Sequence, residues 1–262
     1  MPPAVRRDGG RPGDAPSVPP VATPIIVWKV DGHLDRFYLP VKPAEGPPGV
    51  MIVDCGTPRS WLHSFGEGAE WVEGAHRATI AGRGYVLPGR RVPPFDEAEG
   101  LPQKIIGAVG NDFLLAGSVI FDVPGTSMTR LPADAALPPT DGWHVFAVEI
   151  VNGMIFLDAE LDGAIRRVQL DSGAPASILL RDAGDADDAE ASGRDVLGNA
   201  LAVRKSSGTF KGRTVPLWKM RTFPHLEAVG AATGQKLEGI LGLSSLGQKR
   251  IVITQTRLFL EP

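Results

Sequence analysis

Two aspartates of the chain each close a mostly apolar segment and are followed, two positions later, by glycine. Asp54 follows segment 50–53, and Asp171 follows segment 168–170. Glycine permits a tight turn and lets backbone N–H groups approach the carboxylate. Two carboxyl groups held close together can share one proton, so that one serves as a base and the other as an acid. The pattern therefore predicts a site for acid–base chemistry, if the fold brings the two turns face to face.

A duplication within the chain would bring the two turns together. Each aspartate is followed by an apolar segment with two glycines, and both Gly107 to Gly239 and Gly110 to Gly242 span 132 residues. The aspartates themselves are 117 residues apart, because the first copy carries a Pro- and Gly-rich insertion over residues 43–48. A period this long is not that of a repeat solenoid. We interpret the chain as one lobe that is present twice.

Composition narrows the class of protein. The chain has 262 residues and a net charge of −3 without a basic block, which argues against nucleic acid or an anionic membrane surface as partner. Its single cysteine excludes an internal disulfide and a cysteine-based zinc site. No apolar run approaches the roughly 18 residues of a membrane span, and the start of the chain lacks an apolar signal region. We expect a cytoplasmic protein by default, or a periplasmic or secreted one if a leader is missing.

The spacing of turn residues favours an all-β fold. The 32 glycines and 24 prolines interrupt the chain every few residues and leave short apolar or alternating runs between them. Asn-Gly at 152–153 and Asp-Gly at 162–163 are typical of tight hairpin turns. Short helical stretches are expected only at 60–65, 111–116 and 244–246. The expected organisation is a disordered Pro- and Gly-rich tail over 1–23, a first lobe over 24–131, a linker over 132–141 and a second lobe over 142–262.

At this point the chain resembles the aspartic proteases of the pepsin and retropepsin type, in particular the bacterial, retroviral-like members with two lobes. The resemblance lies in segment 105–114, Ile-Ile-Gly-Ala-Val-Gly-Asn-Asp-Phe-Leu, and in segment 171–177, Asp-Ser-Gly-Ala-Pro-Ala-Ser. It covers most of residues 24–262 in two copies. It implies an all-β, bilobal pepsin-like fold, with two duplicated, closed β-barrel-like lobes and a cleft between them.

The resemblance also implies a function. The chain would be an aspartic-type endopeptidase that hydrolyses peptide bonds of a peptide or protein substrate with an activated water, and it would need no cofactor and no metal. Both catalytic aspartates lie in one chain, so we expect a monomer. Two carboxyl groups about 3 Å apart share one proton in such dyads and titrate as a unit. The residues implied are the catalytic pair Asp54 and Asp171, the supporting loop residues Cys55, Gly56, Thr57, Ser172, Gly173 and Ala174, and Tyr85 as a candidate for the flap.

One departure from the family pattern leaves alternatives open. The middle residue of each triplet normally offers a hydroxyl that bonds across to the opposite loop; Ser172 has one, but Cys55 has a thiol, which is a weak donor. One alternative is therefore a catalytically inactive protease-like protein that binds a peptide or protein in the cleft. A β-barrel carrier for a small apolar ligand leaves the paired triplets unexplained. Cys55 as a nucleophile lacks a surrounding Cys-His-Asn signature, which favours a buried structural thiol.

Overall fold

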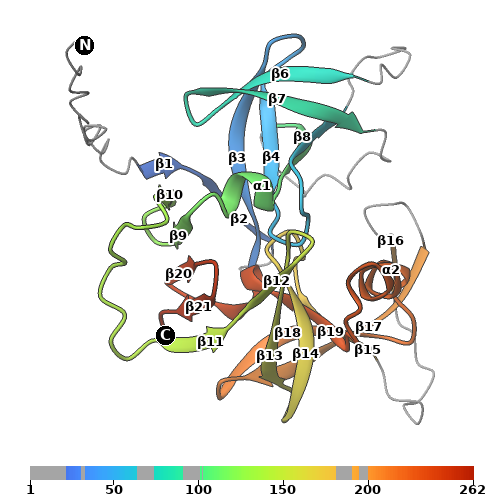
Figure 1. The fold of residues 1–262 in the computed structure, drawn as a ribbon. Coiled ribbons are helices and arrows are strands. Elements are labelled where there is room, and N and C mark those ends of the chain that lie inside the picture. Colours follow the sequence, from blue (N-terminus) through green and yellow to red (C-terminus); the bar gives the residue numbers. More distant parts are fainter. Residues whose placement is uncertain are drawn as a thin grey trace, which may run out of the picture.

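Strands dominate the chain and form three sheets (Figure 1). The computed structural model describes residues 22–30, 33–63, 74–90, 101, 103–180, 191–194 and 200–262. A seven-stranded sheet comes from the first half of the chain, an eight-stranded sheet comes from the second half, and a six-stranded sheet takes strands from both. The expected all-β, two-lobed fold is therefore confirmed. Among the described helices, none is long and apolar enough to cross a membrane.

The first lobe is a closed barrel, and two of its neighbouring strands are buried throughout. Its strands run in the order β2-β3-β4-β8-β5-β7-β6, and a further pairing of β3 with β6 closes the ring. All residues of β4 and β8 are buried, as expected for parallel neighbours covered on both faces. The elements are β2 (Ile26–Val30), β3 (His33–Pro43), β4 (Gly49–Val53), β5 (Trp61–His63), β6 (Ala75–Ile80), β7 (Arg83–Arg90), β8 (Ile105–Val109) and α1 (Asn111–Leu114).

The second lobe repeats this ring. Its strands run in the order β12-β13-β14-β19-β15-β18-β17-β16, and β13 also pairs with β17, so β3, β4, β8, β5, β7 and β6 correspond to β13, β14, β19, β15, β18 and β17. The elements are β12 (Glu149–Val151), β13 (Met154–Leu161), β14 (Ala164–Asp171), β15 (Ser177–Leu180), β16 (Ala191–Arg194), β17 (Ala200–Phe210), β18 (Arg213–Met220), α2 (Pro224–Thr233), β19 (Gly239–Gly242) and the 3-10 helix η1 (Leu243–Leu246).

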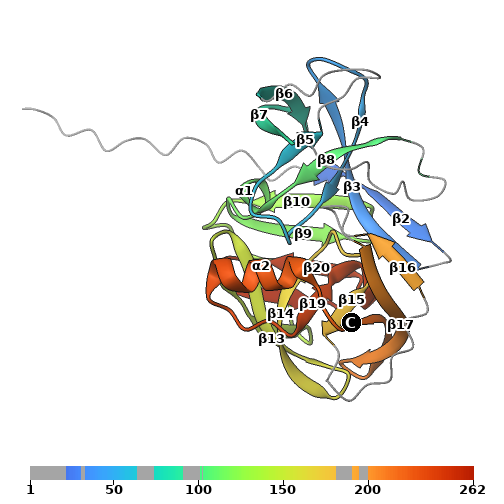
Figure 2. The same cartoon turned by 90° about the vertical axis from the view of Figure 1, so that its right-hand side faces the viewer.

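The six-stranded sheet joins the lobes, and Figure 2 shows β9, β10 and β20 between them. β9 of the first half pairs with β20 of the second, with Ile120 opposite Val252. These two residues are 132 apart, so the pair lies on an approximate twofold axis that relates the halves. The sheet order is β1-β10-β9-β20-β21-β11. Its strands are β1 (Ala22–Pro24), β9 (Ser118–Asp122), β10 (Ser127–Leu131), β11 (His144–Ala147), β20 (Arg250–Ile253) and β21 (Arg257–Leu260).

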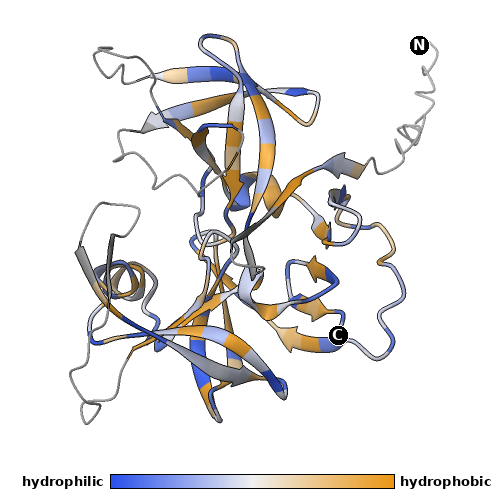
Figure 3. Cartoon of the chain, turned by 180° about the vertical axis from the view of Figure 1, so that it is seen from behind, coloured by the Kyte–Doolittle hydropathy of each residue, from blue (hydrophilic) through white to orange (hydrophobic). Residues whose placement is uncertain are grey.

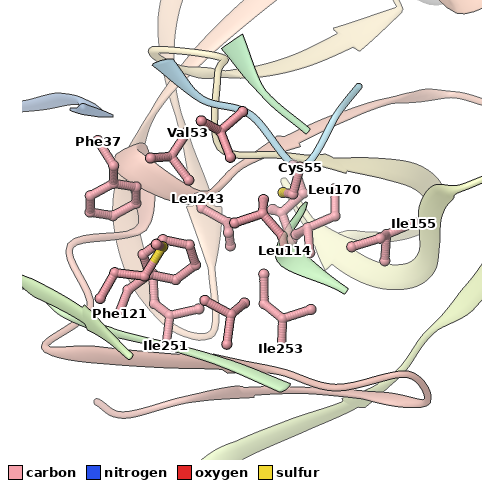
Figure 4. Close-up of a cluster of buried hydrophobic side chains, with 14 of the residues drawn as sticks. Phe37, Val53, Cys55, Leu114, Phe121, Ile155, Leu170, Leu243, Ile251 and Ile253 are labelled. Atoms are coloured by element: carbon pink, nitrogen blue, oxygen red, sulfur yellow. The ribbon is translucent and has the colours of Figure 1, made fainter. Parts of the chain in front are cut away.

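The largest apolar core is continuous across the three sheets. Figure 3 shows hydrophobic residues along the strands of both lobes and hydrophilic residues at several hairpin turns. In Figure 4, Phe121 and Ile251 of the shared sheet lie in the same cluster as Val53 and Leu170, which immediately precede the two aspartates. The core therefore reaches the base of both aspartate turns and fixes where they lie.

Several local expectations are tested by the structure. Residues 61–63 form strand β5, not the expected helical stretch, because Trp61 pairs with Ala108 of β8 and completes the barrel. Helices occur where expected at Asn111 and at Leu243–Leu246, whereas α2 was not anticipated. Most of the expected tail, residues 1–21, lies outside the described residues, and β1 already begins at Ala22. β10 ends at Leu131 and β11 begins at His144, on either side of the expected linker.

Candidate active site

The two aspartates occupy corresponding ends of the paired barrels. Asp54 follows β4, and Asp171 is the last residue of β14. Each of these strands runs parallel to the Gly-containing strand of its own lobe, β8 or β19. The Asp54 N–H donates to the carbonyl of Val109, the last residue of β8, at 2.9 Å. Both aspartates keep part of their surface accessible.

Each aspartate loop packs its glycine against the carboxyl group of the other loop. A Cβ atom on Gly56 would lie 2.5 Å from Cγ of Asp171, and one on Gly173 would lie 2.8 Å from Cγ of Asp54. No side chain fits at such distances, so glycine is required by the close approach of the loops. The structure therefore brings Asp54 and Asp171 face to face.

Backbone N–H groups of the loops hold the carboxyl oxygens. Gly56 N–H donates to Oδ1 of Asp54 at 2.8 Å. Oδ1 of Asp171 accepts from Gly173 N–H at 2.7 Å and from Ala174 N–H at 3.0 Å. Hydrogen bonds of this kind favour the ionised carboxylate. They offset part of the cost of placing two acids together.

The environment of Asp54 raises its pKa well above the ordinary value. The largest cause is burial, followed by the negative charge of Asp171 and a hydrogen bond between the two carboxyl groups. The Gly56 N–H and the positive charge of Arg36 act in the opposite direction and lower the pKa of Asp54. Burial and a neighbouring acid both disfavour a second negative charge. The pair is thus arranged to retain a proton over a pH range in which an isolated aspartate is ionised.

Crossed hydrogen bonds tie the loops together behind the carboxyl groups. The Ser172 hydroxyl accepts from Cys55 N–H at 2.9 Å and donates to the Val53 carbonyl at 2.7 Å. In return, the Cys55 sulfur accepts from Ser172 N–H at 3.2 Å. Ser172 thus acts as acceptor and donor, whereas the bond that the structure describes for the Cys55 thiol uses it as an acceptor. The crossed hydrogen bonds are therefore unequal at positions 55 and 172, where one loop has a thiol and the other a hydroxyl.

Cys55 has the properties of a structural thiol. It is completely buried, and its side chain lies among the apolar residues of Figure 4. Burial, with the negative charge of Asp171 next, raises the pKa of the thiol far above its ordinary value, despite hydrogen bonds from Ser172 that lower it. A thiol in this setting stays protonated and is a poor nucleophile.

Two further residues expected at the site, Thr57 and Ala174, link the loops to neighbouring helices. The Thr57 hydroxyl contacts the Arg59 carbonyl at 3.5 Å, and the Thr57 carbonyl accepts from Asn111 N–H at 2.9 Å. Thr57 therefore links the first loop to α1 through its backbone. The Ala174 carbonyl accepts from the Ser244 hydroxyl at 2.9 Å, which links the second loop to η1 in a similar way.

Tyr85 lies on β7, in the wall of the first barrel. Its ring packs against Phe113 of α1 with centroids 5.3 Å apart, and its hydroxyl accepts a hydrogen bond from Arg130 of β10 at 3.4 Å. The corresponding position on β18 is Val215, a core residue that is 2% exposed. The contacts that the structure describes for Tyr85 are thus with α1 of its own lobe and with the shared sheet, and its role as a flap residue stays a prediction.

Two serines to which no role was assigned from the sequence, although Ser177 closes the quoted segment 171–177, fasten the loops to the glycine-containing segments. The Ser60 hydroxyl accepts from Gly110 N–H at 2.9 Å and donates to Asp112 at 2.7 Å. The Ser177 hydroxyl accepts from Gly242 N–H at 3.2 Å. Each serine is the sixth residue after its aspartate, in the shared pattern Asp-x-Gly-x-Pro-x-Ser. Alignment of the two triplets at their aspartates would have found them.

Two side chains that cross between the lobes were also missed. Arg36 donates through Nε to the Gly173 carbonyl at 2.7 Å, and Gln169 donates through Nε2 to the Gly56 carbonyl at 2.8 Å. Donor and acceptor are 137 and 113 residues apart, respectively. No local sequence pattern marks contacts over such separations, so only the folded structure identifies them.

The fold and the paired loops define a pepsin-like, bilobal all-β protein. Comparison with solved structures finds 73 similar chains, among them three that each cover 92% of this one. They are basic 7S globulin from soybean (10% identity, TM-score 0.48, 94% of that chain covered), the aspartic proteinase from Irpex lacteus (14%, 0.47, 97%) and conglutin gamma, a basic 7S globulin from lupine seeds (9%, 0.46, 95%). No family model and no curated protein sequence matches the chain.

Proposed function

We propose that this protein is an aspartic endopeptidase with Asp54 and Asp171 as its catalytic pair. The observation that carries the proposal is the packing of each loop glycine against the carboxyl group of the opposite loop. This packing accompanies a hydrogen bond between the two carboxyl groups and a raised pKa of Asp54. Strongly perturbed pKa values cluster at functional sites, which supports this role for the pair.

The arrangement supports a shared-proton mechanism. In the singly ionised pair, the carboxylate takes a proton from a water molecule while the carboxylic acid donates a proton to the oxygen of the scissile carbonyl. The water oxygen adds to the carbonyl carbon. The carboxyl group that took the water proton then gives it to the amine nitrogen, the C–N bond breaks, and a hydroxyl of the tetrahedral species returns a proton to the other carboxylate, so the pair is again singly ionised. Roles are assigned to the pair and not to one aspartate, because coupled groups titrate together. The substrate would be an extended peptide bound between the lobes.

A second candidate is a non-catalytic protein that binds peptides at the same place. The uneven crossed hydrogen bonds favour it, since the Cys55 thiol replaces the hydroxyl that would mirror Ser172. The carbonyl of Leu170 corresponds to that of Val53 and is where a donor at position 55 would point. A loop with a weaker cross-link would hold its carboxyl group less firmly.

The test uses the single variants Asp54→Asn and Asp171→Asn and the double variant. Both substitutions remove a charge with little change of shape. We expect each single variant to lose about a thousandfold or more of the parent's cleavage of a mixed peptide pool, and the double variant to lose little more, because residues acting as a unit are not additive. Asp134→Asn, at an exposed position in the linker, is the matched control and should cleave like the parent.

The variant Cys55→Thr puts a hydroxyl at the position that mirrors Ser172. It separates the endopeptidase from the non-catalytic binding protein. If the parent cleaves no peptide between about pH 3 and 8, binds extended peptides, and is not activated by Cys55→Thr, the binding protein is the better description. If only one of the two Asn variants loses activity, the shared-proton mechanism is wrong.

A further inference from the structure

The aspartate pair has an uneven electrostatic surrounding. The carbonyl of each loop glycine accepts a hydrogen bond from a side chain of the opposite lobe. At Gly56 the donor is the neutral amide of Gln169, at 2.8 Å, whereas at Gly173 it is the guanidinium of Arg36, at 2.7 Å. Two contacts with equivalent acceptors, made by donors at non-equivalent positions, therefore differ by one positive charge.

Strand register explains why Arg36 lies beside the pair. β3 and β4 are antiparallel, and Tyr38 of β3 is opposite Ile52 of β4. Continuing this register, two residues before Tyr38 and two residues after Ile52, places Arg36 at the level of Asp54. Its acceptor, Gly173, is the residue whose backbone packs against the Asp54 carboxyl group, with a Cβ-to-Cγ distance of 2.8 Å for an added Cβ. The guanidinium is thus one hydrogen bond away from the backbone that covers Asp54.

The position in the second barrel that is equivalent to Arg36 holds no cation. In that barrel, Phe156 of β13 is opposite Gln169 of β14, so Phe156 corresponds to Tyr38, and Met154 corresponds to Arg36. Among the described residues, Asp171, at the end of β14, and Arg36, from β3, act on the pKa of Asp54 through their charges; the pKa of the Cys55 thiol in the same loop is affected by both acids. Arg36 is the cation in this set.

We propose that Arg36 is a positioning residue for the aspartate pair: it fastens the second loop to the first lobe and sets, by its fixed charge, the pH range in which the pair carries one negative charge. The inference rests on the proposed function, because it concerns how the same pair works. Guanidinium suits this role, since it remains charged at every relevant pH and its planar donors fix a direction.

The direction of the effect follows from electrostatics. A nearby cation favours each ionised form of the pair over the form with one more proton. It therefore lowers the pH at which the first proton leaves and the pH at which the shared proton leaves. The lowering of the Asp54 pKa by Arg36, against burial and the charge of Asp171, has the same sign.

The test compares two neutral variants with one charged variant. Arg36→Gln keeps a donor, and Arg36→Met copies the residue at the corresponding position, Met154. In both, the acid and alkaline limbs of the pH–rate curve should move to higher pH, by about one unit for the loss of a close cation. Arg36→Lys keeps the charge but loses the planar donor, so its limbs should stay in place while kcat falls. Arg257→Gln, at an exposed position of β21, should match the parent.

A second measurement separates this inference from the proposed function. The ¹³C signal of the Asp54 carboxyl group reports its titration whether or not the protein cleaves peptides. The midpoint of the Asp54 signal should rise in the two neutral variants, and this result would support the role of Arg36 even if the parent proved inactive.

An unchanged Asp54 midpoint in a folded neutral variant, with cleavage intact, would overturn the inference and leave the proposed function standing. An equal shift in Arg36→Lys would also overturn it, because the charge would then not be the cause. Thermal melting checks that each variant is folded, and two neutral variants are made because either one could fail to fold.

Discussion

At the level of single residues, the opposing effects on the Asp54 carboxyl group have a consequence for stability. Burial and the proximity of Asp171 raise its pKa from an ordinary value of 3.8, while the Gly56 N–H and Arg36 restrain the increase. A carboxyl group with a raised pKa binds its proton more tightly in the folded state than in the unfolded state. Its contribution therefore favours folding at low pH, and this contribution is lost as the pH rises through the folded-state pKa.

This consequence gives a prediction for Asp54→Asn. Asparagine can accept from Gly56 N–H and donate to Asp171 without carrying a charge. At pH 7 the variant should be more stable than the parent by on the order of 1 kcal/mol, since one pKa unit corresponds to about 1.4 kcal/mol. At pH 4 the difference should be small, because the parent carboxyl group is then protonated. Urea denaturation at the two pH values measures both differences.

Asp134→Asn serves as the control, because its side chain is exposed. If Asp54→Asn is instead less stable than the parent at pH 7 and closest to it in stability at pH 4, the two charges of the pair do not oppose folding.

At the level of elements, the two loops are held by matched serine contacts to neighbouring strands. The Ser60 hydroxyl accepts a hydrogen bond from Gly110 N–H, and the Ser177 hydroxyl accepts one from Gly242 N–H. Each glycine is the last of its Gly-rich segment. Both serines are buried, and Ser60 precedes β5 as Ser177 begins β15. The same local device therefore fixes both loops, although the surrounding residues differ.

Removal of either hydroxyl leaves a buried N–H group without its partner. Ser60→Ala and Ser177→Ala should each lower the free energy of unfolding by about 1–3 kcal/mol, the cost of such a group. Ser207→Ala, at an exposed position of β17, should change it by less than about 0.5 kcal/mol. Chemical denaturation provides the comparison, and a loss confined to one serine would show that the two loops are not equivalent.

The sequence predicts the parts of these elements that depend on local chemistry. The paired triplets, the glycine segments and the hairpin turns at Asn152 and Asp162 are marked by residue type, and both turn residues have the positive φ that such turns require. β5 was misjudged because pairing with β8 overrides the local helical pattern. α2 was missed although Pro224 stands at its start and Gly234, with φ of 70°, at its end; few of its residues are buried.

At the level of the whole molecule, the shared sheet makes the lobes interdependent. β9 has β10 on one side and β20 of the other half on the other side. The amide of Asn111 donates to the Cys55 carbonyl at 2.8 Å and to the Gly153 carbonyl, in the second half, at 2.7 Å. A first lobe produced alone would expose the edge of β9 and the apolar face that now contacts the second half.

We therefore predict a single cooperative unfolding transition for the intact chain. Far-ultraviolet circular dichroism and tryptophan fluorescence should give coincident urea curves, as expected for a two-state unit. A fragment ending at residue 135, between β10 and β11, should be unfolded or aggregated in the same buffer. Two separated transitions, or a folded fragment with a cooperative melt of its own, would contradict the prediction.

The strand pair at the centre of the shared sheet also bears on the origin of the chain. Ile120 is opposite Val252, and Val119 and Phe121 are opposite Ile253 and Ile251, so the register is symmetrical about equivalent residues. A strand with this register can pair with a second copy of itself, and a half-length ancestor could have built the same sheet as a homodimer. Fusion into one gene would have freed each half to mutate separately. The contrasts between Cys55 and Ser172, and between Arg36 and Met154, are differences that a homodimer encoded by one gene could not have carried.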